Sequence, residues 1–220
     1  MRFRIRVDSE EGYTPTTLHS NESSPAKGSH AGSLSNPDGL SPGQLAMYVG
    51  IGSMTMLFGA SLVGYFVTRA QARAWRSVDL PQLPWGLWLS TALLLGVSAA
   101  LWDGEQAIAR NRTARLSQRL FVALILGGLF CASQVFNWQQ VARATLSEEV
   151  KGLYIYSFFM LTALHAVHVL AGIVPLWLTH RRSLESRYSS SRREGIHLLR
   201  QYWDFLLVVW VVLLAALHLG

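Results

Sequence analysis

Cysteine and charge are both scarce in this chain of 220 residues. The single cysteine, Cys131, cannot form an intrachain disulfide, and its apolar surroundings favour burial as a small hydrophobic side chain. Charged residues make up only 15% of the chain, whereas soluble proteins carry about 25%. The deficit is concentrated in long apolar runs between short charged blocks, a pattern typical of membrane-spanning segments joined by loops.

The sequence also lacks the motifs of nucleotide, zinc and calcium sites, and the nucleophile elbow of hydrolases. The net charge of +6 does not indicate a nucleic-acid partner. Its basic residues stand in separate segments with apolar stretches between them, so they form no continuous basic face. We therefore expect no binding to nucleic acid, and membrane topology explains the charge better.

What the chain does contain is five apolar runs, each near the ~20 residues that a helix needs to cross ~30 Å of hydrocarbon. They predict an all-α fold, a bundle of five transmembrane helices at about residues 45–67, 85–108, 116–138, 152–178 and 199–219. Ser41 and Pro42 are typical of a helix start. Residues 1–43 are rich in Ser, Gly, Pro, Asn and Glu, which predicts a disordered polar tail before a membrane domain over 44–220.

The distribution of basic residues predicts the orientation of the helices. The tail and the segments after the second and fourth helices fall on one side of the membrane and hold 14 of the 19 Lys and Arg residues. Basic residues favour the cytoplasmic side. We therefore expect a cytoplasmic N-terminus and a periplasmic C-terminus.

The fourth helix carries the most pointed candidate site, because His165, His168 and Gly172 follow one another at helical spacing. A histidine pair at i, i+3 is compatible with metal or haem ligation, but a complete site needs further ligands. No second histidine pair stands on another helix, so we expect no catalytic, metal or cofactor site in this chain. The alternative is that both histidines hydrogen-bond across helices or to lipid headgroups.

Asp204 is the second candidate, because polar side chains within membranes are costly and usually face the bundle interior. It lies about one turn inside the start of the fifth helix. A role in proton transfer and a salt bridge to Arg200 are the two hypotheses, and the salt bridge is favoured.

Small residues gather in the first helix, where Gly52, Gly59 and Ala60 mark a candidate packing face. Small side chains let two helix backbones approach closely in lipid. The other hypothesis is that glycine is simply common in membrane helices.

Four stretches, taken in order, resemble subunit III of the haem–copper oxidases, a superfamily that includes cytochrome c oxidases and bo-type quinol oxidases. Residues 165–172 (HAVHVLAG) resemble its His-Gly-x-His-Val-x-x-Gly signature, and residues 201–210 (QYWDFLLVVW) resemble its Tyr-Trp-His-Phe-x-Asp-Val-Val-Trp signature. Residues 133–138 (SQVFNW) and 53–59 (SMTMLFG) resemble two further family helices. The resemblance covers about residues 45–220 and is closest to the five-helix form of the family.

The resemblance implies a non-catalytic subunit in the inner (plasma) membrane of a bacterium. Haem and copper are then expected in the partner, the catalytic subunit I, with subunit II, a small subunit IV and membrane phospholipids as further partners. Such a subunit supports the stability and proton uptake of the oxidase. The residues that we expect to pack against subunits or lipid are His165, His168, Gly172, Gln134, Tyr202, Trp203, Asp204 and Trp210.

The sequence departs from the family pattern at four polar positions. The resemblance places Met54 where the family has an intramembrane Glu, and Asn137 where Glu is usual. Asp204 replaces the His of the last signature, and Leu207 replaces its Asp. These departures leave two other hypotheses open. One is a subunit III-like protein associated with nitric oxide reductase, and the other is a stand-alone membrane transporter or enzyme, against which the lack of internal repeats counts.

Overall fold

Five α-helices make up nearly all of the described structure, a computed structural model that describes residues 41–71, 85–146, 153–184 and 194–219. They are α1 (Pro42–Gln71), α2 (Gly86–Ala109), α3 (Thr113–Leu146), α4 (Leu153–Leu184) and α5 (Glu194–Leu219). Each is long and apolar enough to cross a membrane. The predicted all-α fold with five membrane-spanning helices is thus confirmed. Most of the expected polar tail, residues 1–40, lies outside the described residues.

The helices run further than their apolar segments. α1 ends at Gln71, α3 at Leu146 and α4 at Leu184, and a helix of 30 residues is about 45 Å long. That length exceeds the ~30 Å hydrocarbon layer. Hydropathy reports only the part of a helix that contacts hydrocarbon, so the ends in the headgroup zone stay helical without an apolar signal.

Two local signals fix helix ends. At the start of α1, the Gln44 amide donates to Ser41 Oγ (3.2 Å) and the Ser41 amide donates to Gln44 Oε1 (3.1 Å). This reciprocal pair is a capping box, and it confirms the predicted helix start. Between α2 and α3, Asn111 adopts a left-handed φ of 55°, a conformation that asparagine tolerates and that ends many helices. The short turn makes α2 and α3 antiparallel neighbours.

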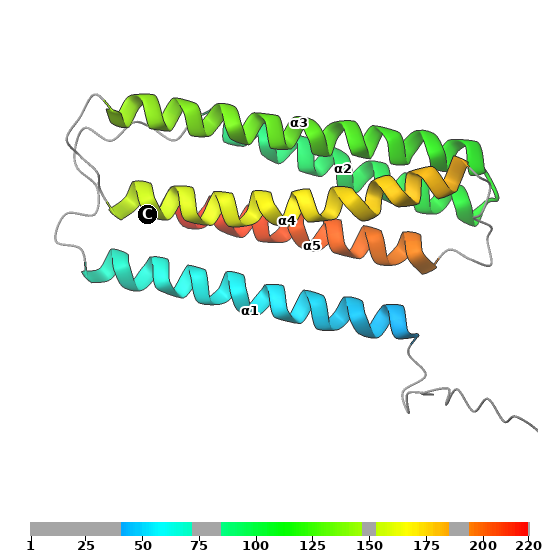
Figure 1. Cartoon of the computed structure of the whole chain (residues 1–220), viewed down its shortest axis with the longest axis horizontal. Coiled ribbons are helices and arrows are strands. Elements are labelled where there is room, and N and C mark those ends of the chain that lie inside the picture. The colour runs from blue at the N-terminus through cyan, green and yellow to red at the C-terminus, as the bar shows by residue number, and fades with distance from the viewer. Residues whose placement is uncertain (1–40, 72–84, 147–152, 185–193, 220) are drawn as a thin grey trace, which may run out of the picture. The chain divides into compact units, whose positions relative to one another are not determined.

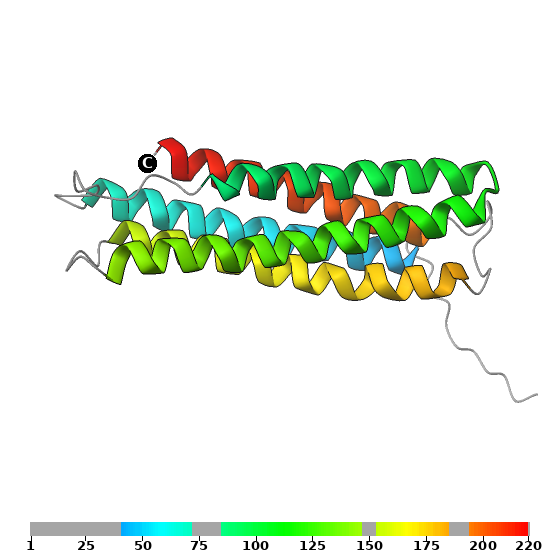
Figure 2. The ribbon, with the colours of Figure 1, turned by 90° about the horizontal axis from the view of Figure 1, so that it is seen from above.

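All five helices belong to one unit, Asp38–Gly220. Within it, α2 packs against α3 and α5, and α4 packs against the same two helices, so four helices form a closed ring of contacts. α1 contacts only α5 and α4 among the described helices. Figures 1 and 2 show the five helices side by side from two directions. The core is largely the interior of the ring, and α1 adds one layer to it.

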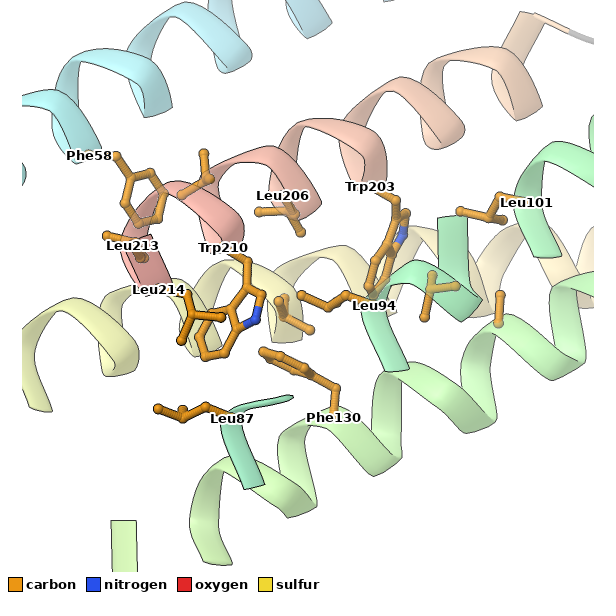
Figure 3. Packing of buried hydrophobic residues seen from close by; sticks show 14 of the residues in the cluster. Phe58, Leu87, Leu94, Leu101, Phe130, Trp203, Leu206, Trp210, Leu213 and Leu214 are labelled. Carbon is orange, nitrogen blue, oxygen red and sulfur yellow. The ribbon is translucent and has the colours of Figure 1, made fainter. Parts of the chain in front are cut away.

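Aromatic side chains dominate the centre of this core. Trp203 and Trp210 of α5 are fully buried, and Phe130 of α3 and Phe58 of α1 pack with them in one cluster. Figure 3 shows Trp210 and Phe130 turned toward one another, with ring centroids 5.2 Å apart at an interplanar angle of 86°. Edge-to-face pairs of this kind are a favoured aromatic geometry.

The small residues of the first helix form no packing face with the other described helices of this chain. Gly52, Gly59 and Ala60 are exposed, and a Cβ added at either glycine would meet nothing within 4 Å. The buried side chains of α1 are instead Phe58 and Tyr65. Among the described residues, α1 therefore meets α4 and α5 through large side chains and not through its small ones. The Tyr65 hydroxyl also donates to the Ala216 carbonyl of α5 (3.2 Å).

Candidate interaction sites in the α4–α5 seam and the charged end

His165 lies at the centre of an aromatic cage built from three other helices. Its ring centroid is 5.1 Å from Trp210 of α5, 5.8 Å from Phe130 of α3 and 6.1 Å from Phe58 of α1. The side chain is 0% exposed, and neither ring nitrogen has a hydrogen-bond partner among the described residues. Of the expected hydrogen bonds, across helices or to lipid headgroups, the described residues provide no cross-helix partner for His165.

His168 lies one turn further along and bonds within its own helix. Its Nδ1 donates to the Leu164 carbonyl (2.7 Å) and its ring is 5.1 Å from that of Phe58. The hydrogen bond between the two helices is accepted by the backbone of His168 instead. Tyr202 Oη of α5 donates to the His168 carbonyl (2.7 Å). The Nδ1 of His168 therefore bonds within α4 and not to another described helix.

Gly172 provides the space in which the tyrosine sits. A Cβ at this position would lie 2.5 Å from Tyr202 Cε1 and 3.4 Å from Trp203 Cζ2. Trp203 also meets α3, where a Cβ on Gly127 would come within 3.2 Å of its ring. The residues of the two signatures thus lie side by side. Tyr202 and Trp203 of α5 pack against Gly172 of α4, and Tyr202 also bonds to His168. We call this contact the α4–α5 seam.

Two further predicted packing residues, Trp210 and Gln134, lie on α5 and α3. The Trp210 Nε1 donates to Thr91 Oγ1 of α2 (3.0 Å). Gln134 is buried on α3, and its amide has no hydrogen-bond partner among the described residues. One turn along α3, Trp138 Nε1 donates to Thr162 Oγ1 of α4 (3.0 Å).

Asp204 belongs to a separate cluster of charges at one end of the bundle. Arg200 Nη1 lies 2.8 Å from Asp204 Oδ2, which confirms the predicted salt bridge. The same guanidinium reaches α2, where Arg200 Nε lies 2.5 Å from Glu105 Oε2. Ser98 of α2 donates to Asp204, and His197 Nδ1 lies 2.8 Å from the other Glu105 oxygen. Ion pairs thus tie the start of α5 to the end of α2.

A second group of ion pairs joins α2 to α3 at the same end. Arg115 Nη2 lies 3.1 Å from Asp103 Oδ1, and Arg119 Nε lies 2.5 Å from Asp103 Oδ2. Neither set of ion pairs to α2 is predicted above from the sequence. The available signal was two acidic residues just before a short turn that is followed by arginines at helical spacing.

Within the described residues, no three His, Cys, Asp or Glu side chains come together in a group able to hold a metal ion. His165 and His168 are instead occupied by aromatic packing and a backbone carbonyl. The contacts present orient helices and place charge at one end of the bundle.

Comparison with known proteins identifies the family of this chain. The sequence pattern of cytochrome c oxidase subunit III matches residues 26–219, most of the chain. The chain belongs to the cytochrome c oxidase subunit III family. The suspected resemblance is thereby confirmed, and the chain is a multi-pass membrane protein of that family.

Bacterial relatives match over much of their length. The probable cytochrome c oxidase subunit 3 of Nocardia farcinica is 26% identical over 191 residues, which cover 84% of this chain and 90% of the relative. Cytochrome c oxidase subunit 3 of Synechocystis sp. is 26% identical over 165 residues, covering 74% of this chain and 69% of the relative. The subunit of Drosophila melanogaster is 28% identical over 130 residues, 59% of this chain, and the match spans only 48% of that relative.

Two of the four positions named as departures from the family signatures are apolar packing positions. Met54 of α1 and Leu207 of α5 are both partly buried and pack against the core. Asn137 is buried on α3, and its Nδ2 donates to Ser90 Oγ of α2 (3.4 Å). Met54, Leu207 and Asn137 are thus uncharged packing residues here, and Asp204 forms its ion pair with Arg200.

Proposed function

We propose that this chain is the non-catalytic subunit III of a bacterial haem–copper respiratory oxidase, held in the plasma membrane. The observation that carries the proposal is the family match over residues 26–219, to which the bacterial relatives add matches along most of the chain. Haem and copper belong to the catalytic partner, subunit I, which would contact this chain directly. Subunit II and a small subunit IV complete the proposed assembly.

The first proposed task is mechanical support of the catalytic subunit. The α4–α5 seam is a closely fitted contact of a glycine, two aromatic rings and a hydrogen bond from the Tyr202 hydroxyl to the His168 carbonyl. Such a preformed bundle offers a partner a rigid surface, so binding costs little conformational ordering. Its exposed side chains are largely apolar, as a contact with lipid or another membrane subunit requires.

The second proposed task is support of proton uptake on the cytoplasmic side. Under the orientation that the basic residues predict, the start of α5 faces the cytoplasm. This end carries the ionisable side chains of Glu105, His197 and Asp204, all partly exposed and linked through Arg200. In the proposed assembly, this charged end would lie beside the cytoplasmic side of the catalytic subunit, where protons enter.

Purification through an affinity tag on this chain tests the proposal. We expect a larger membrane subunit with haem and copper to co-purify in a fixed ratio, and the complex to show an oxidase spectrum with oxygen consumption. A strain without the chain should lose oxidase activity progressively during turnover. The tagged chain separated from its partners should show no haem absorbance.

Two outcomes would overturn the assignment. The first is haem bound stoichiometrically by the isolated chain and lost on His165→Ala or His168→Ala. The second is co-purification with a nitric oxide reductase, seen as nitric oxide consumption without oxygen consumption. Transport by the pure chain in liposomes, abolished by Asp204→Asn, would instead favour a stand-alone transporter.

A further inference from the structure

Two buried polar side chains face the interior of the bundle from α3 and α4. Gln134 and His165 are 1% and 0% exposed, and neither the amide atoms nor the ring nitrogens have a hydrogen-bond partner among the described residues. Both residues lie within the membrane-spanning parts of their helices. We propose that these two side chains bind ordered water between α3 and α4, and we call this place the Gln134–His165 site.

The contacts on either side of Gln134 place it opposite the stretch of α4 that carries His165. One turn before it on α3, the ring of Phe130 lies 5.8 Å from the ring of His165. One turn after it, Trp138 donates to Thr162, which lies one turn before His165 on α4. Residues at i and i+4 share one face of a helix. Gln134 therefore lies between two residues of α3 that contact this part of α4.

The polar groups around the site already have partners within the protein. Trp138 donates its only N–H to Thr162, and the Thr162 hydroxyl donates to a carbonyl one turn back in α4. The Trp210 ring lies 5.1 Å from the ring of His165, and its N–H donates to Thr91 of α2. The phenylalanine rings that complete the cage carry no polar atom. The described neighbours therefore leave the amide and the imidazole to a ligand from outside the chain.

Water is the ligand that fits the chemistry of these two side chains. A polar group that is buried in a membrane protein without a partner is strongly destabilising. An amide offers an acceptor and two donors, and a neutral imidazole offers one of each. A buried water makes about three hydrogen bonds and both donates and accepts. A cation would bind only the amide oxygen and one ring nitrogen, and would leave every N–H donor unpaired.

Thermal unfolding of apolar variants distinguishes a bound water from unpaired polar groups by the sign of the effect. The variants are Gln134→Met, His165→Phe and both together, in the full-length chain purified in detergent with any bound subunits. We expect each single change to lower the unfolding midpoint by roughly 2–10 °C, because the remaining polar side chain loses its bridge. The double variant should recover most of this loss. The control Gln140→Met makes the same change at an exposed position of α3 and should have little effect.

The opposite sign contradicts the proposal. If the two side chains bound no water, each apolar replacement would remove an unpaired buried group and raise the midpoint. The two effects would then add in the double variant. Equal midpoints in Gln134→Met and Gln140→Met would likewise show that Gln134 takes no part in a site.

Nuclear magnetic resonance of the unaltered chain gives a second readout that does not depend on how the variants pack. With isotope-labelled histidine, we expect magnetisation transfer from water protons to the ring of His165, whose signals are assigned by their loss in His165→Phe. The transfer should weaken in Gln134→Met. His197, with 41% of its side chain exposed, provides the positive control. The proposal is wrong if His197 shows the transfer and His165 does not, or if a direct coupling joins the His165 ring to the Gln134 amide.

Discussion

At the scale of single residues, most of the predicted packing set meets in one place, but through contacts that differ from those expected. Helical spacing placed His165, His168 and Gly172 on one face of α4, and that face does meet α5. The spacing did not reveal that His165 would be enclosed by rings. Periodicity identifies a buried face, whereas the partner of each side chain depends on helices far away in the sequence.

Gly172 is the residue at which the seam is most sensitive. Gly172→Ala places a Cβ 2.5 Å from Tyr202 Cε1, so the ring must move and its hydrogen bond to the His168 carbonyl must stretch. Overpacking of this kind costs about 1–3 kcal/mol. We expect a lower midpoint of thermal unfolding in detergent than for the matched variant Gly128→Ala. That control gains the same methyl group in a helix at a position with nothing within 4 Å.

The comparison cancels the intrinsic preference of helices for alanine over glycine, which is about 1 kcal/mol at both sites. Equal unfolding midpoints in the two variants would contradict the steric role of Gly172. A Tyr202→Phe change in the Gly172→Ala background shows whether the hydrogen bond adds to the loss, because it removes the hydroxyl and keeps the ring.

At the scale of helices, the number and type of elements could be predicted because each apolar run is long enough to cross a bilayer. The salt bridge of Arg200 to Asp204 could also be predicted, since it joins residues at i, i+4 in one helix. Its second partner, Glu105, lies on α2, and no local pattern links two helices that have two other helices between them in the sequence. That the small residues of α1 pack against no other described helix has the same cause: composition shows what would permit close packing, and tertiary structure decides where it occurs.

Arg200 connects α2 and α5, so its loss should loosen the charged end of the bundle. Arg200→Gln leaves Glu105 and Asp204 without their shared cation. Breaking a buried ion pair costs several kcal/mol, and exposed pairs contribute less than about 1 kcal/mol. Because Arg200 keeps 25% of its side chain exposed, we expect an intermediate loss of about 1–2 kcal/mol.

Thermal unfolding at two salt concentrations measures this contribution. The matched control is Arg143→Gln, which removes the same charge from an exposed position near the end of α3. The deficit of Arg200→Gln relative to this control should shrink between 0.15 and 1 M salt, because the screening length falls from about 8 to about 3 Å. A deficit of zero at low salt would show that the cluster does not hold α2 and α5 together.

At the scale of the whole molecule, the orientation in the membrane is the prediction on which the proposed proton-uptake role rests. Its basis is the asymmetry of 14 against 5 basic residues between the two sides. Because the chain has a single cysteine, replacing it allows the orientation to be measured with newly introduced cysteines. In a Cys131→Ser background, a new cysteine at position 147 or 189 reports the accessibility of the segment before or after α4.

We expect Ser147→Cys to react with a membrane-impermeant maleimide in intact spheroplasts, and Ser189→Cys to react only after the membrane is opened. The segment 185–193 contains three of the arginines that favour the cytoplasm, whereas 147–152 contains one lysine and two glutamates. A permeant maleimide should label both variants, which controls for local reactivity. The reverse pattern would place the start of α5, with Glu105, His197 and Asp204, on the outer surface. Those side chains would then lie on the side from which oxidases do not take up protons, and the cluster would keep only its role in joining α2 to α5.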